Sequence, residues 1–295
     1  MDVEDRRRRR VRAQRIAPRG TDVVQVVRDV CGIQAQDAAA ARLAVRARCA
    51  GVTAADVDAA GLVRTWAWRN TLHLLAADDV PWALAAVGPW KKSARWRRLG
   101  LTEEVYARAR AAILAALPAS RAELRERLGA DAEGQRLPHL TARLAREGRL
   151  ELRLDDTYAP LELPPLPPRE EALAELGRRY VAAFGPSTAR DQRKWSGVTA
   201  PHAGGGGELA PPSVRLLPAF DTYLLGYADR ADVVAPEHEK HVFPGGGWIH
   251  PVVLVDGRAA GTWRVAGGDV EVVPFEAPPD LTEEIADVRR FLGSS

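Results

Sequence analysis

The chain has 295 residues, of which 46% are hydrophobic and 27% are charged. That length exceeds the usual size of one domain, about 100–150 residues, and the apolar content is ample for packed cores. The sequence holds no run of about 18 apolar residues, and its basic opening Arg6 to Arg10 leads into a polar helix. We therefore expect a cytoplasmic protein of two or three structural units, with neither a membrane span nor a secretory leader.

Cysteine and histidine content argues against a metal or disulfide scaffold. Cys31 and Cys49 are the only cysteines, too few for a disulfide framework and without the four-ligand spacing of a structural zinc site. We expect both to be buried, reduced thiols. His238 and His241 lie beside glutamates but lack a third ligand at a dependable spacing, so a polar loop is the simpler interpretation. We expect no metal and no cofactor.

Positive charge is concentrated in the first third of the chain. The net charge is +3, yet residues 1–100 carry 19 Lys or Arg against 10 Asp or Glu, and the remainder is acidic. Such asymmetry is the expected footprint of a surface that contacts polyanions, because each neutralised phosphate releases condensed counterions.

Residues 1–100 predict three helices followed by a two-stranded ribbon, the order of a winged helix-turn-helix unit. Thr53 is the expected N-cap of the third helix, and Arg69 and Asn70 the expected turn of the ribbon. The expected helices cover 22–30, 38–49 and a segment after Thr53, and the expected strands cover 64–68 and 71–75.

Two glutamines lie two positions apart before the second of these helices, in the stretch GIQAQD at 32–37. A glutamine side chain stays uncharged but offers one acceptor and two donors, enough to hold a water molecule or a sugar oxygen. Gln34 and Gln36 converge only where the backbone is extended or turning. We therefore expect a shaped loop or a helix entry that faces a polar ligand, with a solvated turn as the simpler alternative.

A basic stretch follows the ribbon. Lys91, Arg95 and Arg98 have the spacing of one helix face, and Trp90 and Trp96 lie beside them. A solvated helix end would give the same pattern, but positive charge without an acid between residues 88 and 100 favours a surface that follows nucleic-acid phosphates. The basic residues of this stretch are Lys91, Lys92, Arg95, Arg97 and Arg98.

Residues 101–168 give the clearest pattern. An amphipathic helix over 103–117 ends at Pro118, and a second helix opens at Ser120 with Glu123 completing a capping box. A third helix carries leucines on one face and stops at Gly148, and alternating strands at 150–154 and 158–163 follow. This order predicts a second winged helix-turn-helix domain.

The third helix of that domain presents a basic stripe on its outward side. In a winged helix-turn-helix this helix is normally offered to nucleic acid. An ordinary solvated surface opposite a leucine face is an equal alternative, and the acidic neighbours Glu133 and Glu147 weigh against DNA contact. Any contact here should be mostly to phosphate, with little reading of bases. The stripe consists of Arg136, His139, Arg143 and Arg146.

Residues 169–295 begin like a third winged helix and then change character. A helix over 170–184 follows a Pro-rich linker, and Ser187 is the expected cap of a short helix toward Trp195. The glycine tract Gly204 to Gly207 occupies the place of a recognition helix and wing. The expected later elements are strands at 214–217, 223–227, 251–255, 261–265 and 270–273, a hairpin turn at Asp256-Gly257, and a helix over 282–292.

The predicted fold is therefore α+β. It consists of tandem winged helix-turn-helix domains over 1–100 and 101–168, followed over 169–295 by a truncated third winged helix and a β-rich unit.

Several motifs carry a resemblance to one family. They are the stretches GIQAQ at 32–36, RTWAWRNTLH at 64–73, LLPAFDTYLLGY at 216–227 and GRAAGTWR at 257–264. With these motifs, in this order and over nearly its whole length, the chain resembles the tandem winged-helix DNA-binding family that includes the AlkZ and YcaQ DNA glycosylases. That family has a catalytic Gln-apolar-Gln signature in its AlkZ branch, which Gln34-Ala35-Gln36 fits.

The resemblance implies a monofunctional DNA glycosylase that excises cationic N7-alkylated purines, including interstrand crosslinks, from duplex DNA in an open cleft. Gln34 and Gln36 would position water, and Asp37 would supply a carboxylate near the sugar or merely cap the next helix. Double-stranded DNA is the expected partner of a monomer. A non-catalytic DNA-binding regulator is the alternative, and a degenerate relative retained for protein interaction is a third hypothesis. The roles of His73 and Asp221 stay open, as shaping the fold or touching DNA.

Overall fold

Short polar motifs set where several helices begin. In the part of the chain that the computed structural model describes, residues 1–277 and 279–293, three helices open with a capping box in which hydroxyl and carboxylate bond the backbone reciprocally. The pairs are Thr53 with Asp56, Ser120 with Glu123, and Thr188 with Asp191. The first two confirm the predicted starts. The predicted cap Ser187 is wrong by one residue, because Thr188 has the acid at the required spacing.

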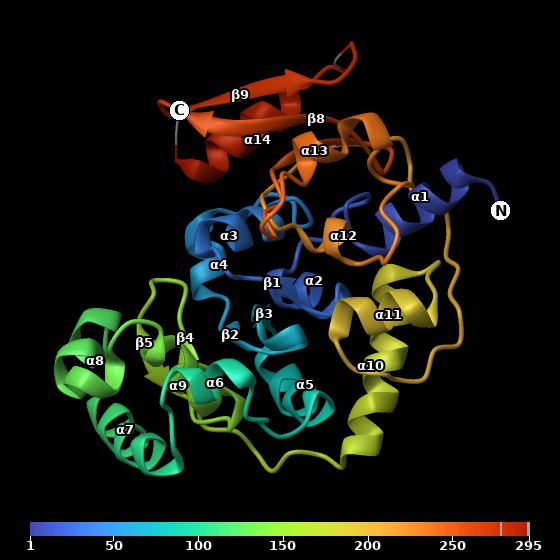
Figure 1. Cartoon of the computed structure of the whole chain (residues 1–295). Coiled ribbons are helices and arrows are strands. Elements are labelled where there is room, and N and C mark those ends of the chain that lie inside the picture. The colour runs from blue at the N-terminus through green and yellow to red at the C-terminus, as the bar shows by residue number, and fades with distance from the viewer. Residues whose placement is uncertain (278, 294–295) are drawn as a thin grey trace.

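The first unit confirms the predicted order of helices and strands (Figure 1). The β2–β3 turn contains Arg69 and Asn70, with left-handed φ of 51° and 59°. A short third strand pairs antiparallel with β3, so the glutamine motif begins in a sheet of order β1-β3-β2 and not in a loop. The elements are α2 (Val23–Asp29), β1 (Ile33–Gln34), α3 (Ala38–Arg46), α4 (Ala54–Ala59), β2 (Val63–Trp66) and β3 (Leu72–Leu75).

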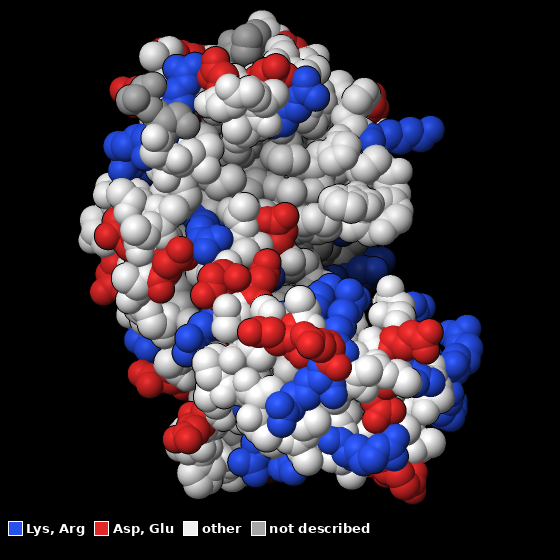
Figure 2. Space-filling view, turned by 90° about the vertical axis from the view of Figure 1, so that its left-hand side faces the viewer, with Lys and Arg blue, Asp and Glu red and all other residues white. Residues whose placement is uncertain are grey.

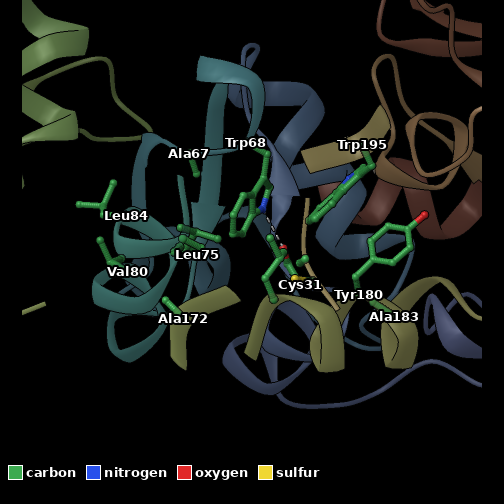
Figure 3. Packing of buried hydrophobic residues seen from close by; sticks show 14 of the residues in the cluster. Cys31, Ala67, Trp68, Leu75, Val80, Leu84, Ala172, Tyr180, Ala183 and Trp195 are labelled. Carbon is green, nitrogen blue, oxygen red and sulfur yellow. Dashed lines mark hydrogen bonds between the residues drawn. The ribbon is translucent and has the colours of Figure 1, made fainter. Parts of the chain in front are cut away.

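Trp68, just after β2, centres the core behind this sheet. Its ring is completely buried between Trp82 and Trp195, at centroid distances of 5.7 and 5.3 Å, and its Nε1–H donates to the carbonyl of Cys31 at 3.4 Å (Figure 3). Two helices cover the core, α5 (Val80–Val87) and α10 (Arg169–Phe184). Residues from the first and the last third of the chain therefore share one core. Trp66, Trp68 and Trp263 are buried, as expected.

The second unit matches its predicted elements. Its third helix buries Leu137, Leu140 and Leu144 completely, against a core that also receives Trp66 and Trp96 from the first unit. The elements are α7 (Glu103–Ala116), α8 (Arg121–Leu128), α9 (Arg136–Arg146), β4 (Leu150–Leu152) and β5 (Tyr158–Pro160).

The last section holds a four-stranded antiparallel sheet of order β6-β7-β8-β9, in which the predicted hairpin turn at Asp256-Gly257 joins β7 to β8 and which a final helix covers. The strand predicted at 223–227 is wrong: Asp221 caps a buried helical turn there, and a short apolar run does not distinguish the two. The elements are α11 (Ala189–Ser196), β6 (Val214–Leu217), α12 (Thr222–Leu225), α13 (Glu239–Val242), β7 (Val252–Val255), β8 (Arg258–Ala266), β9 (Asp269–Pro274) and α14 (Thr282–Leu292).

The N-terminal arginines hold the last section in place. From α1 (Val3–Ala13), Arg6 and Arg10 pair with Asp232 at 2.6 and 3.0 Å, and Arg8 donates to the carbonyl of Ala210. Arg9 donates to the carbonyl of Gly207, so the glycine tract is attached to α1. This basic run is therefore largely structural.

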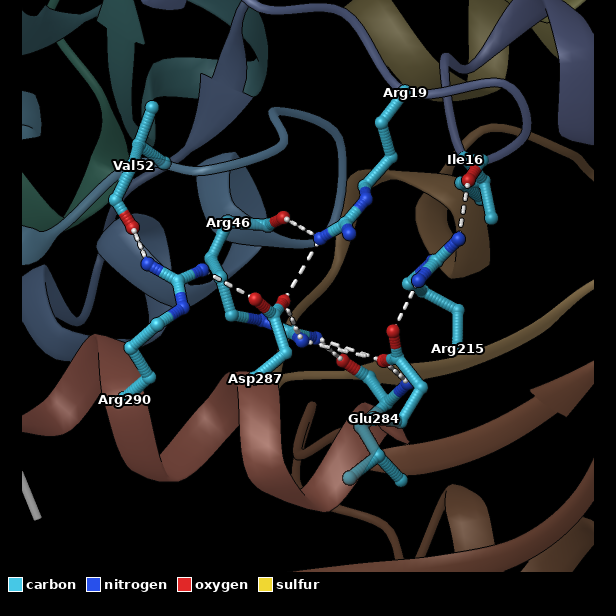
Figure 4. Close-up of polar contacts among 9 residues, drawn as sticks. Ile16, Arg19, Arg46, Val52, Arg215, Glu284, Asp287 and Arg290 are labelled. Carbon is cyan, nitrogen blue, oxygen red and sulfur yellow. Dashed lines mark hydrogen bonds and ion pairs between the residues drawn. The ribbon is translucent and has the colours of Figure 1, made fainter. Parts of the chain in front are cut away.

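A second polar cluster joins α14 to the first unit (Figure 4). Arg46 of α3 is completely buried and donates to Glu284 at 3.2 Å and to the carbonyl of Leu216 at 2.7 Å. Glu284 also pairs with Arg215 and accepts from the backbone of Leu216. Buried charges are stable only when paired and hydrogen-bonded, and these contacts meet that condition. Within the described ranges, no helix has the length and apolarity needed to cross a membrane.

Candidate active site

The two glutamines lie beside β3 of the β1-β3-β2 sheet, at the end nearest the β2–β3 turn. Gln34 pairs in register with His73, and two residues later Gln36 extends the ladder through its side chain, with Oε1 accepting from the N–H of Leu72 at 3.2 Å. Successive residues of a strand point to opposite faces, so Gln34 shares a face with His73, whereas the hollow that Gln36 lines is formed with Leu72 on the other face. β1 ends at Gln34 and the chain bends at Gln36, so the two side chains do not converge on one face of the sheet.

A row of polar side chains crosses the sheet at Gln34. The row runs from Gln34 through His73 to Thr65, each directly opposite the next. Gln34 Oε1 and Thr65 Oγ1 are buried and have no hydrogen-bond partner among the described residues. Leaving such an atom unpaired costs on the order of 1–3 kcal/mol, so each one in a native structure calls for an explanation.

His73 is a neutral member of this row. Its side chain is almost completely buried, and Nδ1 lies 2.9 Å from the carbonyl of Thr71, which fixes the proton on Nδ1. The pKa of His73 is lowered to about 4, mainly by burial and in smaller part by the charge of Arg69, while the bond to Thr71 opposes the shift. His73 is therefore not a proton donor at neutral pH.

Gln36 opens onto a hollow of about 640 Å³ between the sheet and the second unit. The first unit contributes Arg64, Trp66 and Leu72, and the second contributes Arg121 and Tyr158 among others. Arg64 forms an ion pair with Asp156 and donates hydrogen bonds to the carbonyls of Ala35 and Arg153. It therefore stabilises the backbone of the glutamine motif. Gln34 is half-buried and does not line this hollow.

Asp37 is exposed and caps α3. One carboxylate oxygen accepts from the N–H of Ala40 at 2.8 Å, as an N-cap residue does. The structural role foreseen for Asp37 is therefore present, directly after the glutamine pair.

The basic stretch before the second unit forms a shorter helix than its spacing suggests. α6 spans only Ala94–Arg98 and is capped by Ser93, so Lys91 and Lys92 precede the helix. The expectation that Lys91, Arg95 and Arg98 share a helix face is wrong. Lys92 pairs with Glu103 at 3.0 Å, so this stretch is also not free of compensating charge. The side chains of Lys91, Arg95, Arg97 and Arg98 are exposed.

The expected outward stripe of α9 is largely bound within the protein. Arg136 donates to the carbonyls of Leu99 and Ala130, and Arg146 donates to that of Gly88. Arg143 pairs with Glu103 and Glu147, and its guanidinium lies 3.6 Å from the ring centre of Tyr106. Periodicity identified the outward face but not these distant partners.

The remaining member of the stripe is half-buried. Burial and the charge of Arg95 lower the pKa of His139, so it is uncharged at neutral pH. Figure 2 shows where basic side chains remain accessible: they gather on the lower part of the molecule, which holds the second unit, below a hollow whose upper wall is mostly uncharged.

Other candidates are structural. Asp221 is completely buried against Arg48. Cys31 and Cys49 are free and buried, and burial raises the pKa of both thiols. The described residues contain no cluster of metal-ligating side chains, and His238 stacks on Phe275 at 4.1 Å between ring centres. Sequence analysis missed a basic group at Arg69, Arg190, Arg193 and Lys194, for which the Arg-x-x-Arg-Lys spacing after the Thr188 cap was an available signal.

These features describe an α+β protein with an amide-rich site beside basic surface. The family model "DNA glycosylase AlkZ-like" matches residues 27–204 and 199–291. The chain belongs to this family, and it is a DNA glycosylase, a hydrolase that acts on N-glycosyl bonds in DNA repair.

Two comparisons specify the similarity further. The chain is 31% identical to the interstrand DNA cross-link repair glycosylase of Streptomyces sahachiroi, over 95% of this chain and 93% of that protein. Its structure is similar to that of Streptomyces sahachiroi DNA glycosylase AlkZ, with a TM-score of 0.78 and 27% identity over 100% of this chain and 98% of that one.

Proposed function

We propose that the enzyme removes cationic N7-alkylated purines from double-stranded DNA, interstrand crosslinks included. The observation that carries this proposal is the unsatisfied carboxamide oxygen of Gln34. Gln36, two residues later, lines a hollow at the sheet edge. A carboxamide oxygen without a partner in the described part of the protein can accept a hydrogen bond from an attacking water molecule.

The chemistry of the lesion suits a site without a strong acid. A purine alkylated at N7 already carries positive charge, so its departure needs no proton from the protein. Neutral His73 is consistent with that requirement. The protein has to place a water molecule, which Gln34 and Gln36 would do, and to stabilise an oxocarbenium-like sugar. Asp37 would provide negative charge for the second task while one of its oxygens caps α3.

The proposed DNA-binding architecture is a set of winged helices. α2, α3 and α4 with the β2–β3 hairpin would form one within residues 1–100, and α7, α8 and α9 with β4 and β5 another within 101–168. Residues 169–295 would hold a truncated third. We propose that Lys91, Arg95, Arg97 and Arg98 contact the DNA backbone and that α9 acts mainly through its position. The protein would act as a monomer in the cytoplasm, where its substrate lies.

The test is excision of 7-methylguanine from a duplex oligonucleotide by the purified protein. We expect release of the free base, and a fall of about 10²–10³-fold in Gln34→Ala and Gln36→Ala, the usual loss when a positioned polar group is removed. Gln25→Ala on α2 is the matched control, because that amide bonds only to Asp29 among the described residues. Duplex binding without excision by the unaltered protein would favour the regulator hypothesis.

Asp37 is tested by a substitution that keeps its cap. Asn is as good an N-cap as Asp, so Asp37→Asn should leave the melting temperature within about 2 °C while removing the charge. We expect excision to fall at least tenfold. Unchanged excision would assign Asp37 to α3 alone.

A further inference from the structure

A second basic surface lies on the other side of the glutamine motif from α6. There α11 packs against the β2–β3 turn, and Figure 1 shows the two helices on either side of the β1-β3-β2 sheet. Between α11 and the turn is a hollow of about 720 Å³. Its basic lining residues are Arg69, Arg190, Arg193 and Lys194.

The sequence of α11 separates its basic residues from its acid. Arg190, Arg193 and Lys194 have i, i+3, i+4 spacing and are exposed on one face. Trp195 and Gln192 are buried on the other. Asp191 points inward, where it accepts from Thr188 and from the N–H of Ala228 at 2.8 Å. The acid of this helix therefore does not neutralise its basic face.

Backbone geometry brings Arg69 to the same hollow. Its left-handed conformation turns the β2–β3 loop toward α11, whose C-cap Gly197 is also left-handed at φ 79°. A Cβ on Gly197 would lie 3.2 Å from Arg69 Cγ, so glycine there permits the close approach. Cationic side chains more than a hundred residues apart in sequence thus converge.

The cations that line this hollow are not paired with acids. Across the described ranges, no ion pair joins Arg69, Arg190, Arg193 or Lys194 to a carboxylate. Desolvation lowers the pKa of Arg69, and the charge of nearby Arg230 lowers it further. Asp229 and Glu239 line an adjoining hollow of about 380 Å³, which Arg190, Lys194 and Arg230 also line. Close cations that repel one another in a concave surface favour a polyanionic ligand.

We propose that this hollow binds the phosphodiester backbone of duplex DNA next to the lesion, an inference that rests on the proposed function. Its place in the fold supports the assignment. Arg69 lies in the turn after β2, three residues before Leu72, whose N–H is bonded by Gln36. Backbone held here would run past the glutamine pair, and α6 would hold it on the opposite side. The paired arginines of α9 offer no comparable free charge.

The test measures binding of an undamaged duplex over a range of NaCl concentrations, by fluorescence anisotropy. Each lost phosphate contact should reduce the slope of log K against log[salt] by about 0.9. We expect a reduction of about 1–2 for Arg190→Gln/Lys194→Gln and about 1 for Arg69→Gln, with affinity at 100 mM salt lower by tenfold or more. Arg125→Gln/Arg127→Gln on α8, equally exposed, is the matched control.

The proposal would be overturned if both variants kept the salt slope of the unaltered protein. It would also be overturned if the salt slope of the α8 control fell as much as theirs. Arg69 and α11 are separate elements, so misfolding of one variant does not affect the other. The outcome is also independent of turnover. If Gln34→Ala loses excision but the α11 variant has an unchanged salt slope, DNA binding in the hollow is rejected and the glycosylase proposal stands. If the salt slope changes but the unaltered protein excises no base, the glycosylase proposal is rejected and DNA binding in the hollow stands.

Discussion

Arg48 and Asp221 form a two-pronged ion pair in which both side chains are completely buried. Nη1 lies 2.8 Å from Oδ2 and Nη2 lies 2.7 Å from Oδ1. Arg48 also donates to Gln14, and Asp221 caps α12 through the N–H of Tyr223. Three distant segments of the chain therefore meet at one charge pair.

Removing one member of this pair should be far more damaging than removing both. Asp221→Asn leaves a buried guanidinium uncompensated, and we expect the free energy of unfolding to fall by about 3–5 kcal/mol. Arg48→Met/Asp221→Leu removes both charges and should recover at least half of that loss. Urea unfolding of the three proteins is the measurement, and equal losses in both variants would contradict the argument.

A pH-dependent part of the stability should come from His73. The pKa of about 4 in the folded protein lies below the ordinary value of 6.5, so the unfolded chain binds more protons between these limits. This contribution is complete above pH 6.5 and is lost as pH falls toward 4. From pH 7 to 4.5 the loss should be about 2–3 kcal/mol.

His73→Asn separates this term from the carboxylates. Asn can donate to the carbonyl of Thr71 as Nδ1 does but does not titrate. Urea unfolding of the variant should vary less between pH 7 and pH 4.5 than that of the unaltered protein. Equal pH dependence in the two proteins would mean that His73 is not held neutral.

The two basic helices should respond differently to neutralisation. Lys91→Gln/Arg95→Gln removes exposed charges and should reduce the salt slope of duplex binding by about 1–2 without loss of stability. Arg143→Gln should instead cost about 1–2 kcal/mol of stability, because Arg143 contacts Glu103, Glu147 and Tyr106, and change the slope little. A fall in slope for Arg143→Gln as large as for the pair would restore α9 as a DNA contact.

Local chemistry made much of the fold predictable. The caps Thr53 and Ser120, the leucine face of α9 and the Asp256-Gly257 turn each depend on residues close in sequence, and all are present. The failures depend on distance. β1 is two residues long and exists because β3 pairs with it, and the partner of Arg143 lies 40 residues earlier.

The candidate site shows the same division. The Gln-x-Gln spacing required an extended backbone for the two side chains to converge, but β1 ends at Gln34 and the chain bends at Gln36. The unsatisfied oxygen of Gln34 and the convergence of Arg69 with α11 arise only when the sheet and Gly197 are in place. Periodicity within one helix contains no information on either.

The glycine tract, attached to α1 at its Gly207 end, is the expected site of proteolytic cleavage. A cut between Gly204 and Gly207 would fall where the glycines have no side chains to shield the backbone. The two fragments would remain associated, because the buried ion pairs Arg48–Asp221 and Arg46–Glu284 join residues on opposite sides of the cut. Nicked enzyme should therefore migrate as one species on a sizing column and separate only in denaturant, and a tolerant insertion point for a reporter lies at the same place.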